Sequence, residues 1–163
     1  MPMAGSAEPK VGALADKLRT DLAVAWSPDG TRIAFPGGEC ENIADACLTI
    51  GNVATGGETA VAVYGGGPNI DGGFAVVPSF NVTGQKLAYT AYTDGRTPVH
   101  VEEIDPSGAG RRTVGVAEDR EMVYASTGTA LLTAKYQGAS WVMIVDLATG
   151  KRTPFKRGSQ PAA

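Results

Sequence analysis

The stretch Trp26-Ser-Pro-Asp-Gly-Thr-Arg-Ile-Ala-Phe35 combines an aromatic residue, a tight turn and a short apolar strand. The same pattern returns 54 positions later, without a gap, as Phe80-Asn-Val-Thr-Gly-Gln-Lys-Leu-Ala-Tyr89. A third, weaker copy begins 44 positions further on as Tyr124-Ala-Ser-Thr-Gly-Thr-Ala-Leu-Leu-Thr133. Repetition at such a period is typical of architectures in which supersecondary units stack on one another. The sequence therefore predicts one structural unit repeated three times.

The turn inside each copy predicts a β-hairpin. Pro28 presets the backbone at the second turn position, and the side chain of Asp29 is suited to accept hydrogen bonds from nearby amides. Gly30 then supplies the left-handed conformation that closes the hairpin, and we expect Gly84 and Gly128 to do the same in the other copies. One aromatic residue precedes each turn and is expected to pack one unit on the next; these residues are Trp26, Phe80 and Tyr124.

A second landmark follows each turn at a similar distance. It is an apolar strand and a glycine turn, as in Leu48-Thr-Ile50 with Ala54-Thr-Gly-Gly57, Val99-His-Val101 with Asp105-Pro-Ser-Gly108, and Val142-Met-Ile144 with Ala148-Thr-Gly150-Lys151. Each unit is thus predicted to contain four short antiparallel strands, which is the blade of a β-propeller. A β-sandwich also has many short strands, but it gives no reason for repetition in register. We predict an all-β fold of about three blades, at about 22–64, 74–115 and 119–155, with an extension over 1–21 and a tail over 156–163.

The segment Ser27–Phe35 after an aromatic residue, together with Asp146-Leu-Ala-Thr-Gly-Lys151, resembles the repeats of TolB-like β-propellers. The resemblance covers 22–155 and is specific for the blade, while the family includes periplasmic scaffolds, protease gating domains and polysaccharide lyases. TolB-like propellers usually have six blades, so three blades correspond to half a ring. The segment 15–20 resembles the closing strand of a preceding blade.

Half a ring predicts self-association. Three blades in a row leave two apolar sheet faces and their edges exposed, and such surfaces usually mark an interface. Two copies related by a twofold axis would join the first blade of each to the third blade of the other, and would give six blades. We therefore expect a homodimer, in which the strand around Leu18 completes the edge of a third blade.

Composition limits the choice of partners. The chain has 163 residues, 43% of them apolar, and a formal net charge of −3. This balance excludes nucleic-acid binding through net charge, and no apolar run is long enough to suggest a membrane helix. The partners we expect are a second copy and an unidentified protein or peptide. The location is left open, with a periplasmic or secreted one favoured over the cytoplasm.

One loop contains both cysteines and several acids. Cys40 and Cys47 are suited to a local disulfide in an oxidising compartment, and two free buried thiols are the alternative. Glu39, Glu41 and Asp45 lie in the same loop, where they are either solvated acids or oxygen ligands for Ca²⁺ in an unfamiliar spacing. We predict no metal or cofactor, and we consider this loop the preferred place for a partner contact because blade-end loops carry function in propellers.

No constellation of residues predicts catalysis. His100 is the one histidine, it lies on a predicted strand, and no nucleophile is placed beside it by a recognised motif. The sequence Gly-x-Ser-x-Gly, which marks the nucleophile of many hydrolases, does not occur. We therefore predict a non-catalytic binding or scaffolding module. The alternatives are a carbohydrate-active propeller enzyme, a lyase or a hydrolase, and a designed or fragmentary propeller with a purely structural role.

Overall fold

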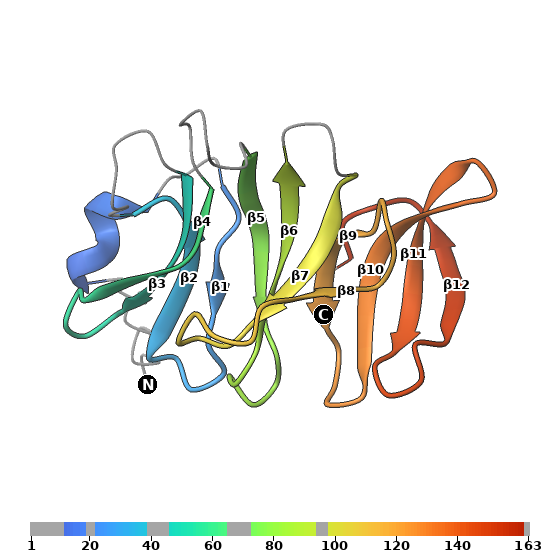
Figure 1. Cartoon of the computed structure of the whole chain (residues 1–163). Helices are drawn as coiled ribbons and strands as arrows, with labels where there is room; N and C mark the ends of the chain where they lie inside the picture. Colours follow the sequence, from blue (N-terminus) through green and yellow to red (C-terminus); the bar gives the residue numbers. More distant parts are fainter. Residues whose placement is uncertain (1–11, 19–21, 39–45, 65–72, 94–97, 162–163) are drawn as a thin grey trace, which may run out of the picture.

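A computed structural model describes residues 12–18, 22–38, 46–64, 73–93 and 98–161 of the chain. Its strands form three antiparallel sheets, each built from four consecutive strands (Figure 1). The first sheet contains β1 (Ala25–Trp26), β2 (Arg32–Pro36), β3 (Ala46–Asn52) and β4 (Glu58–Tyr64). The second contains β5 (Gly73–Phe80), β6 (Leu87–Thr93), β7 (His100–Ile104) and β8 (Arg112–Val114). The third contains β9 (Arg120–Tyr124), β10 (Thr129–Tyr136), β11 (Ala139–Asp146) and β12 (Arg152–Arg157), so β12 extends into the segment expected to be a tail.

The sheets stand side by side as three blades, from β1–β4 at the left of Figure 1 to β9–β12 at the right. Strand alternation gives each sheet two faces, and the faces between neighbouring blades are buried. In β6, Leu87 and Tyr89 pack against the first blade, whereas Ala88 packs against the third. The first strands of neighbouring blades also lie against each other, β1 on β5 and β5 on β9. The predicted all-β propeller fold with about three blades is therefore confirmed.

A short helix covers the outward face of the first blade. Gly12–Lys17 forms a 3-10 helix, η1, which corrects the closing strand expected over 15–20; residues 19–21 lie outside the described part of the chain. Leu14 is fully buried in a small cluster with Ile33 and Phe35. The reason for the difference is a long-range contact: the compact turn of η1 inserts Leu14 into the hollow above Gly51.

The hairpins confirm the predicted backbone at two positions and correct it at the third. Gly30 and Gly84 have φ values of 69° and 70°, whereas Gly128 is not in the left-handed region. Trp26 pairs with Ile33 and Phe80 with Leu87, but Tyr124 pairs with Ala130, so the third hairpin is one residue shorter. The gapless alignment of the third copy is therefore wrong. The one-residue shift matters because it moves each side chain of the following strand to the opposite face of the sheet.

Two first strands also share a bulge. Val77 in β5 and Glu121 in β9 both lie three residues before the aromatic residue of their copy, and their φ values are 51° and 54°. Strand pairing shifts register at both places. A positive φ is a strained conformation for a β-branched residue such as valine. The bulge is thus a repeated feature of the second and third blades.

Candidate functional site

Two adjacent glutamates on β7 connect the second blade to both neighbours. Because successive strand residues point to opposite faces, Glu102 faces the first blade and Glu103 faces the third. Glu102 is 8% exposed and accepts hydrogen bonds from Tyr64 Oη at 3.1 Å, Tyr89 Oη at 2.5 Å and Arg111 Nε at 2.6 Å. Arg111 also donates to Tyr64 Oη at 2.7 Å and lies 5.0 Å from the centre of that ring. A buried charge is thus fully paired across the boundary between two blades.

These contacts set the charge state of the cluster. Burial alone would raise the pKa of Glu102, but hydrogen bonds from Arg111, Tyr89 and His100, together with the charge of Arg111, lower that pKa overall. Burial is the main cause that raises the pKa of Tyr64 to about 12. Burial and the hydrogen bond to Glu102 likewise raise the pKa of Tyr89. The cluster therefore holds a carboxylate, a guanidinium and two neutral phenols at neutral pH.

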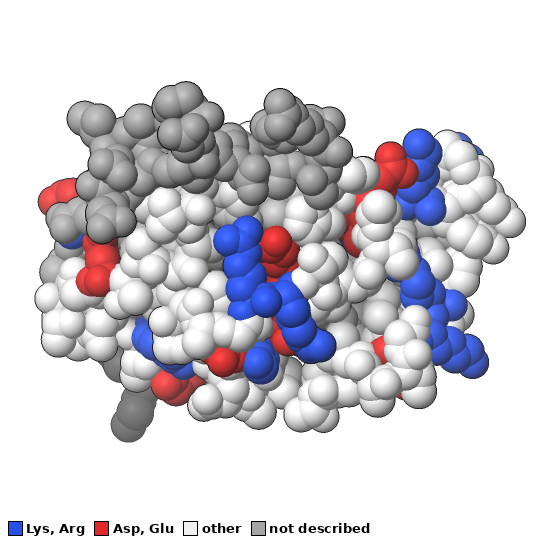
Figure 2. All heavy atoms as spheres, viewed as in Figure 1, with Lys and Arg blue, Asp and Glu red and all other residues white. Residues whose placement is uncertain are grey.

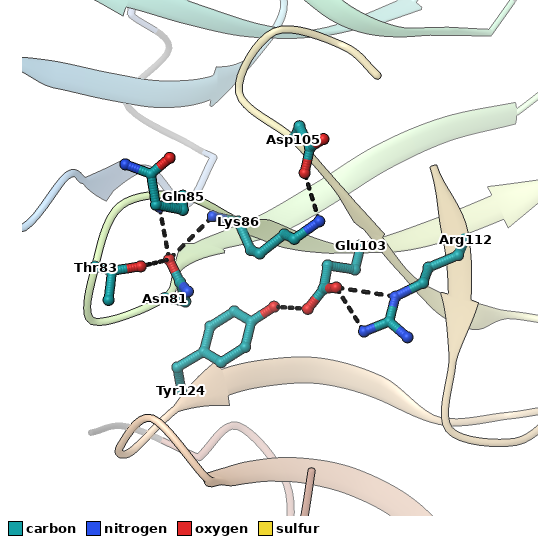
Figure 3. A network of polar contacts seen from close by, with 8 residues as sticks. All are labelled: Asn81, Thr83, Gln85, Lys86, Glu103, Asp105, Arg112 and Tyr124. Atoms are coloured by element: carbon teal, nitrogen blue, oxygen red, sulfur yellow. Dashed lines mark hydrogen bonds and ion pairs between the residues drawn. The ribbon is translucent and has the colours of Figure 1, made fainter. Parts of the chain in front are cut away.

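Glu103 makes the corresponding connection on the other face (Figure 3). It is 5% exposed, accepts a short hydrogen bond from the hydroxyl of Tyr124 on the third blade, and pairs with Arg112 Nε at 3.0 Å and Nη2 at 2.7 Å. Arg112 is the partner of Glu103 in the register of β7 and β8. We call the two sets, Glu102 with Tyr64, Tyr89, His100 and Arg111, and Glu103 with Tyr124 and Arg112, the blade clamps. They fix the three blades relative to one another.

A solvent-facing groove lies beside these clamps, where the first blade meets the hairpins of the second. We call it the hairpin groove; it encloses about 420 Å³ and is lined by Arg32, Gln85, Lys86, Asp105, Pro106 and Ser107. Lys86 Nζ pairs with Asp105 Oδ1 at 2.5 Å. The side chain of Asn81 shapes the hairpin, because its Oδ1 accepts the amides of Gln85 at 2.9 Å and Lys86 at 3.0 Å (Figure 3).

Arg32 forms the wall of the groove from the first blade. Its Nη2 donates to the carbonyl of Gly84 at 2.9 Å, and its guanidinium carbon lies 5.4 Å from the centre of the Phe80 ring. A Cβ at position 84 would lie 3.1 Å from Nη2, so glycine allows the close approach as well as the positive φ. Arg32 and Lys86 occupy the same column of the repeat, which brings two cations to one groove from two blades.

The charges around the groove are mixed. On the part of the viewed face that the structure describes, basic and acidic side chains lie next to one another (Figure 2). Asp29 is close enough for the charge of Arg32 to affect its carboxyl. Hydrogen bonds from the Ser27 hydroxyl and the Thr31 amide and hydroxyl, together with that charge, lower the pKa of Asp29 to about 2. The groove thus contains two cations and one acid, with a second acid nearby.

The aromatic residues of the three turns differ in environment. Phe80 and Tyr124 are each 8% exposed and pack against the preceding blade, as expected. Trp26 is 40% exposed, and the expectation of blade packing is wrong for it in the single chain, because the described residues place no blade before the first one.

His100 is buried on β7, on the same face as Glu102. Its Nε2 lies 3.1 Å from Glu102 Oε1 and its Nδ1 lies 2.9 Å from the carbonyl of Pro98. Beside it is a hollow of about 180 Å³ lined by Pro98, His100, Thr113 and Ala117. Its contacts make it a member of the Glu102 blade clamp.

The predicted partner loop is outside the described residues, and with it Glu39, Cys40, Glu41 and Asp45. Cys47 lies on β3, is 2% exposed and is in a disulfide; its pairing with Cys40 stays a prediction. Within the described ranges, no group of three His, Cys, Asp or Glu residues is placed to hold a metal ion. No described helix is long and apolar enough to cross a membrane.

Sequence reasoning missed both the blade clamps and the groove. The signal for the clamps was present as a Glu-Glu pair on one strand and an Arg-Arg pair eight positions after Glu103. A hairpin register would have paired Glu103 with Arg112. The signal for the groove was the presence of a basic residue, Arg32 or Lys86, at equivalent positions of the first two repeats.

Comparison with solved structures places this architecture among propellers. The chain matches TolB from Acinetobacter baumannii with a TM-score of 0.62 and 21% identity, covering 83% of this chain and 31% of that one. It matches the β-propeller domain of the Trilobed protease from Pyrococcus furiosus with a TM-score of 0.54 and 12% identity, covering 85% and 41%. An oligogalacturonate lyase in complex with manganese matches with a TM-score of 0.57 and 14% identity, covering 78% and 33%. No family model and no curated protein sequence matches the chain.

These similarities show the fold: the chain consists of TolB-like propeller blades. It spans about a third of the TolB chain and of the lyase chain, and about two fifths of the protease propeller. Since the matched proteins include TolB, a lyase and a protease domain, the fold by itself leaves the activity open.

Proposed function

We propose that the chain is a non-catalytic binding and scaffolding module that completes a ring of blades with a second copy of itself. The observation that carries this proposal is the exposure of Trp26. Phe80 and Tyr124, at the same position of their copies, are each buried against a preceding blade at 8% exposure, whereas Trp26 is 40% exposed. The first blade thus keeps a residue suited to packing against a neighbour.

The blade clamps support a scaffolding role. Removing one partner from a buried carboxylate strongly destabilises the folded structure. Each blade clamp therefore resists separation of the blades that it joins. Three blades held in this way present the hairpin groove as a preformed surface. A preformed surface lowers the entropic cost of binding a partner.

The opposite end of the chain offers the complementary face. On the third blade, Leu131, Val142 and Ile144 point away from the second blade and are half-buried, and Phe155 on the outermost strand is 64% exposed. In a twofold dimer the third blade of one copy meets the first blade of the other, and both interfaces are the same. The two copies then supply six blades.

Ring closure has one requirement. Ile33 and Phe35 correspond to Leu87 and Tyr89, which pack against the preceding blade, but in the single chain they are covered by Leu14. A neighbouring blade and Leu14 therefore compete for the same surface. In the dimer η1 must leave this position.

Light scattering over a dilution series tests the proposal. We expect a species of twice 16.7 kDa at high concentration and a melting temperature that rises with concentration. Trp26→Ser should weaken the dimer, while Phe74→Ser, which changes another exposed aromatic residue at 48% exposure, should not. A folded monomer at every concentration, with a concentration-independent melt, would refute ring closure.

A further inference from the structure

We infer that the hairpin groove binds the carboxylate of an acidic side chain in a peptide, and that Arg32 is the residue that recognises it. The inference rests on the proposed role as a binding module and gives that role a ligand class. It concerns a surface within one chain, so it does not depend on dimer formation. The groove volume of about 420 Å³ is in the range of small-ligand sites.

The geometry of Arg32 carries the first step. The carbonyl of Gly84 and the ring of Phe80 hold the guanidinium in one orientation, so little side-chain entropy remains to be lost on binding. Only Nη2 is used by the carbonyl, and no described carboxylate forms an ion pair with Arg32, although Asp29 is close enough to feel its charge. The remaining N–H groups form the planar fork that matches a carboxylate with two parallel hydrogen bonds.

The other lining residues carry the second step. Lys86 is already paired with Asp105, so the pair adds one donor group and one acceptor group with little net charge. Among the described residues, no hydrogen bond involves the side-chain amide of Gln85 or the hydroxyl of Ser107. Neutral donors and acceptors of this kind match the amide groups of a peptide backbone that flank an acidic side chain.

The charge balance selects among anions. Asp105 lines the groove and Asp29 lies nearby, so a dianionic phosphate would meet two carboxylates for two cations. A single carboxylate needs one guanidinium fork, which Arg32 supplies. The groove therefore favours an aspartate or glutamate side chain over a phosphorylated one.

The test is a titration of the ¹⁵N-labelled chain, followed by amide chemical shifts. The probe is the acetylated and amidated tripeptide Ala-Glu-Ala, with Ala-Gln-Ala and Ala-phosphoserine-Ala as comparison peptides. We expect saturable shifts at the amides of Gly84, Gln85 and Ser107 with the glutamate peptide, at least tenfold weaker binding of the glutamine peptide, and weakening by salt.

Variants assign the binding to the fork. Arg32→Gln should weaken binding at least tenfold, and Arg32→Lys should recover less than half of that loss in free energy, because it restores the charge without the fork. Lys135→Gln is the matched control, since it removes an exposed cation of the third blade that pairs loosely with Glu118 at 3.7 Å. Ser107→Ala provides a second groove variant that leaves the packing of Arg32 on Phe80 intact, in case Arg32→Gln unfolds.

Three results would overturn the inference. They are the absence of saturable shifts in the wild-type chain, equal affinity for the glutamate and glutamine peptides, and a preference for the phosphopeptide. In each case light scattering still reports separately on ring assembly. Failure of the groove and failure of the proposed function are therefore distinguishable.

Discussion

Replacing Gly51 by alanine tests whether Leu14 is a fixed part of the first blade. A Cβ at position 51 would lie 2.5 Å from Leu14 Cδ1 and 2.9 Å from Cδ2, whereas carbon atoms in contact are separated by about 3.5–4.0 Å. The overlap is therefore about 1 Å. Leu14 is fully buried with Ile33 and Phe35, so relieving the overlap requires its side chain or η1 to shift within this cluster. Overpacking of this kind costs about 1–3 kcal/mol of unfolding free energy.

The reciprocal change makes the test specific. Leu14→Ala removes the buried side chain and should cost about 2–5 kcal/mol, with the lower end expected if η1 simply detaches. With alanine at position 14 the overlap disappears, so adding Gly51→Ala should then be neutral or slightly stabilising. The double-mutant cycle should give a coupling free energy of at least about 1 kcal/mol.

Urea unfolding followed by circular dichroism measures the four free energies. Gly57→Ala is the matched control, because a Cβ there meets one Thr55 oxygen at an ordinary 3.4 Å; it should change stability by less than about 0.5 kcal/mol. If Gly51→Ala is as mild as Gly57→Ala, or if the two costs add without coupling, Leu14 does not occupy the hollow above Gly51.

Three further outcomes are expected. Gly30→Val and Gly84→Val should each lower stability by about 1–3 kcal/mol, because both positions have positive φ, and unchanged melting temperatures for both would contradict the hairpin interpretation. Tyr124→Phe removes a hydrogen bond to buried Glu103 and should cost about 1–3 kcal/mol in thermal unfolding, whereas a cost near zero would mean that this blade clamp adds little. The folded-state pKa of Glu102 is lowered, so its contribution is complete above its unfolded value near 4.5 and is lost as the pH falls further; Glu102→Gln should reduce this acid sensitivity in urea melts at pH 7 to 3.

The blades could be predicted from the repeat because each repeated residue type meets a structural requirement of the blade. A hairpin with this geometry needs a left-handed residue, and Gly30 and Gly84 supply it at equal spacing. The third copy was aligned incorrectly because Gly128 does not adopt the left-handed conformation of Gly30 and Gly84. There the Ala125 amide reaches the Thr129 carbonyl, one residue sooner than in the other hairpins. Hairpin length is set by backbone hydrogen bonds that a single sequence does not display.

The η1 helix that caps the first blade and the blade clamps were harder to predict, for different reasons. A six-residue 3-10 helix is too short to show a hydrophobic period. The burial of Leu14 also depends on a hollow above Gly51, which is 37 positions away in the sequence. Glu102 and Glu103 look like solvated strand residues until the sheets on both sides are placed. Long-range packing decides both features, and local pattern carries little information about it.

The outward face of the first blade is only partly covered by residues of the same chain. Leu14 covers Ile33 and Phe35, which are each 1% exposed, yet Trp26 on the neighbouring strand remains 40% exposed. A neighbouring blade would cover all three side chains, as the first blade does for Leu87, Tyr89 and Phe80. One buried leucine contributes about 1.5–3 kcal/mol, whereas a blade interface buries many such side chains. The ion pair of Lys17 with Glu58, at 2.6 Å, joins a partly exposed lysine to a carboxylate that is 6% exposed, so breaking this pair opposes the departure of η1. In the proposed ring, we expect the larger blade interface to outweigh these contributions, so η1 would be replaced where a second copy is available at sufficient concentration.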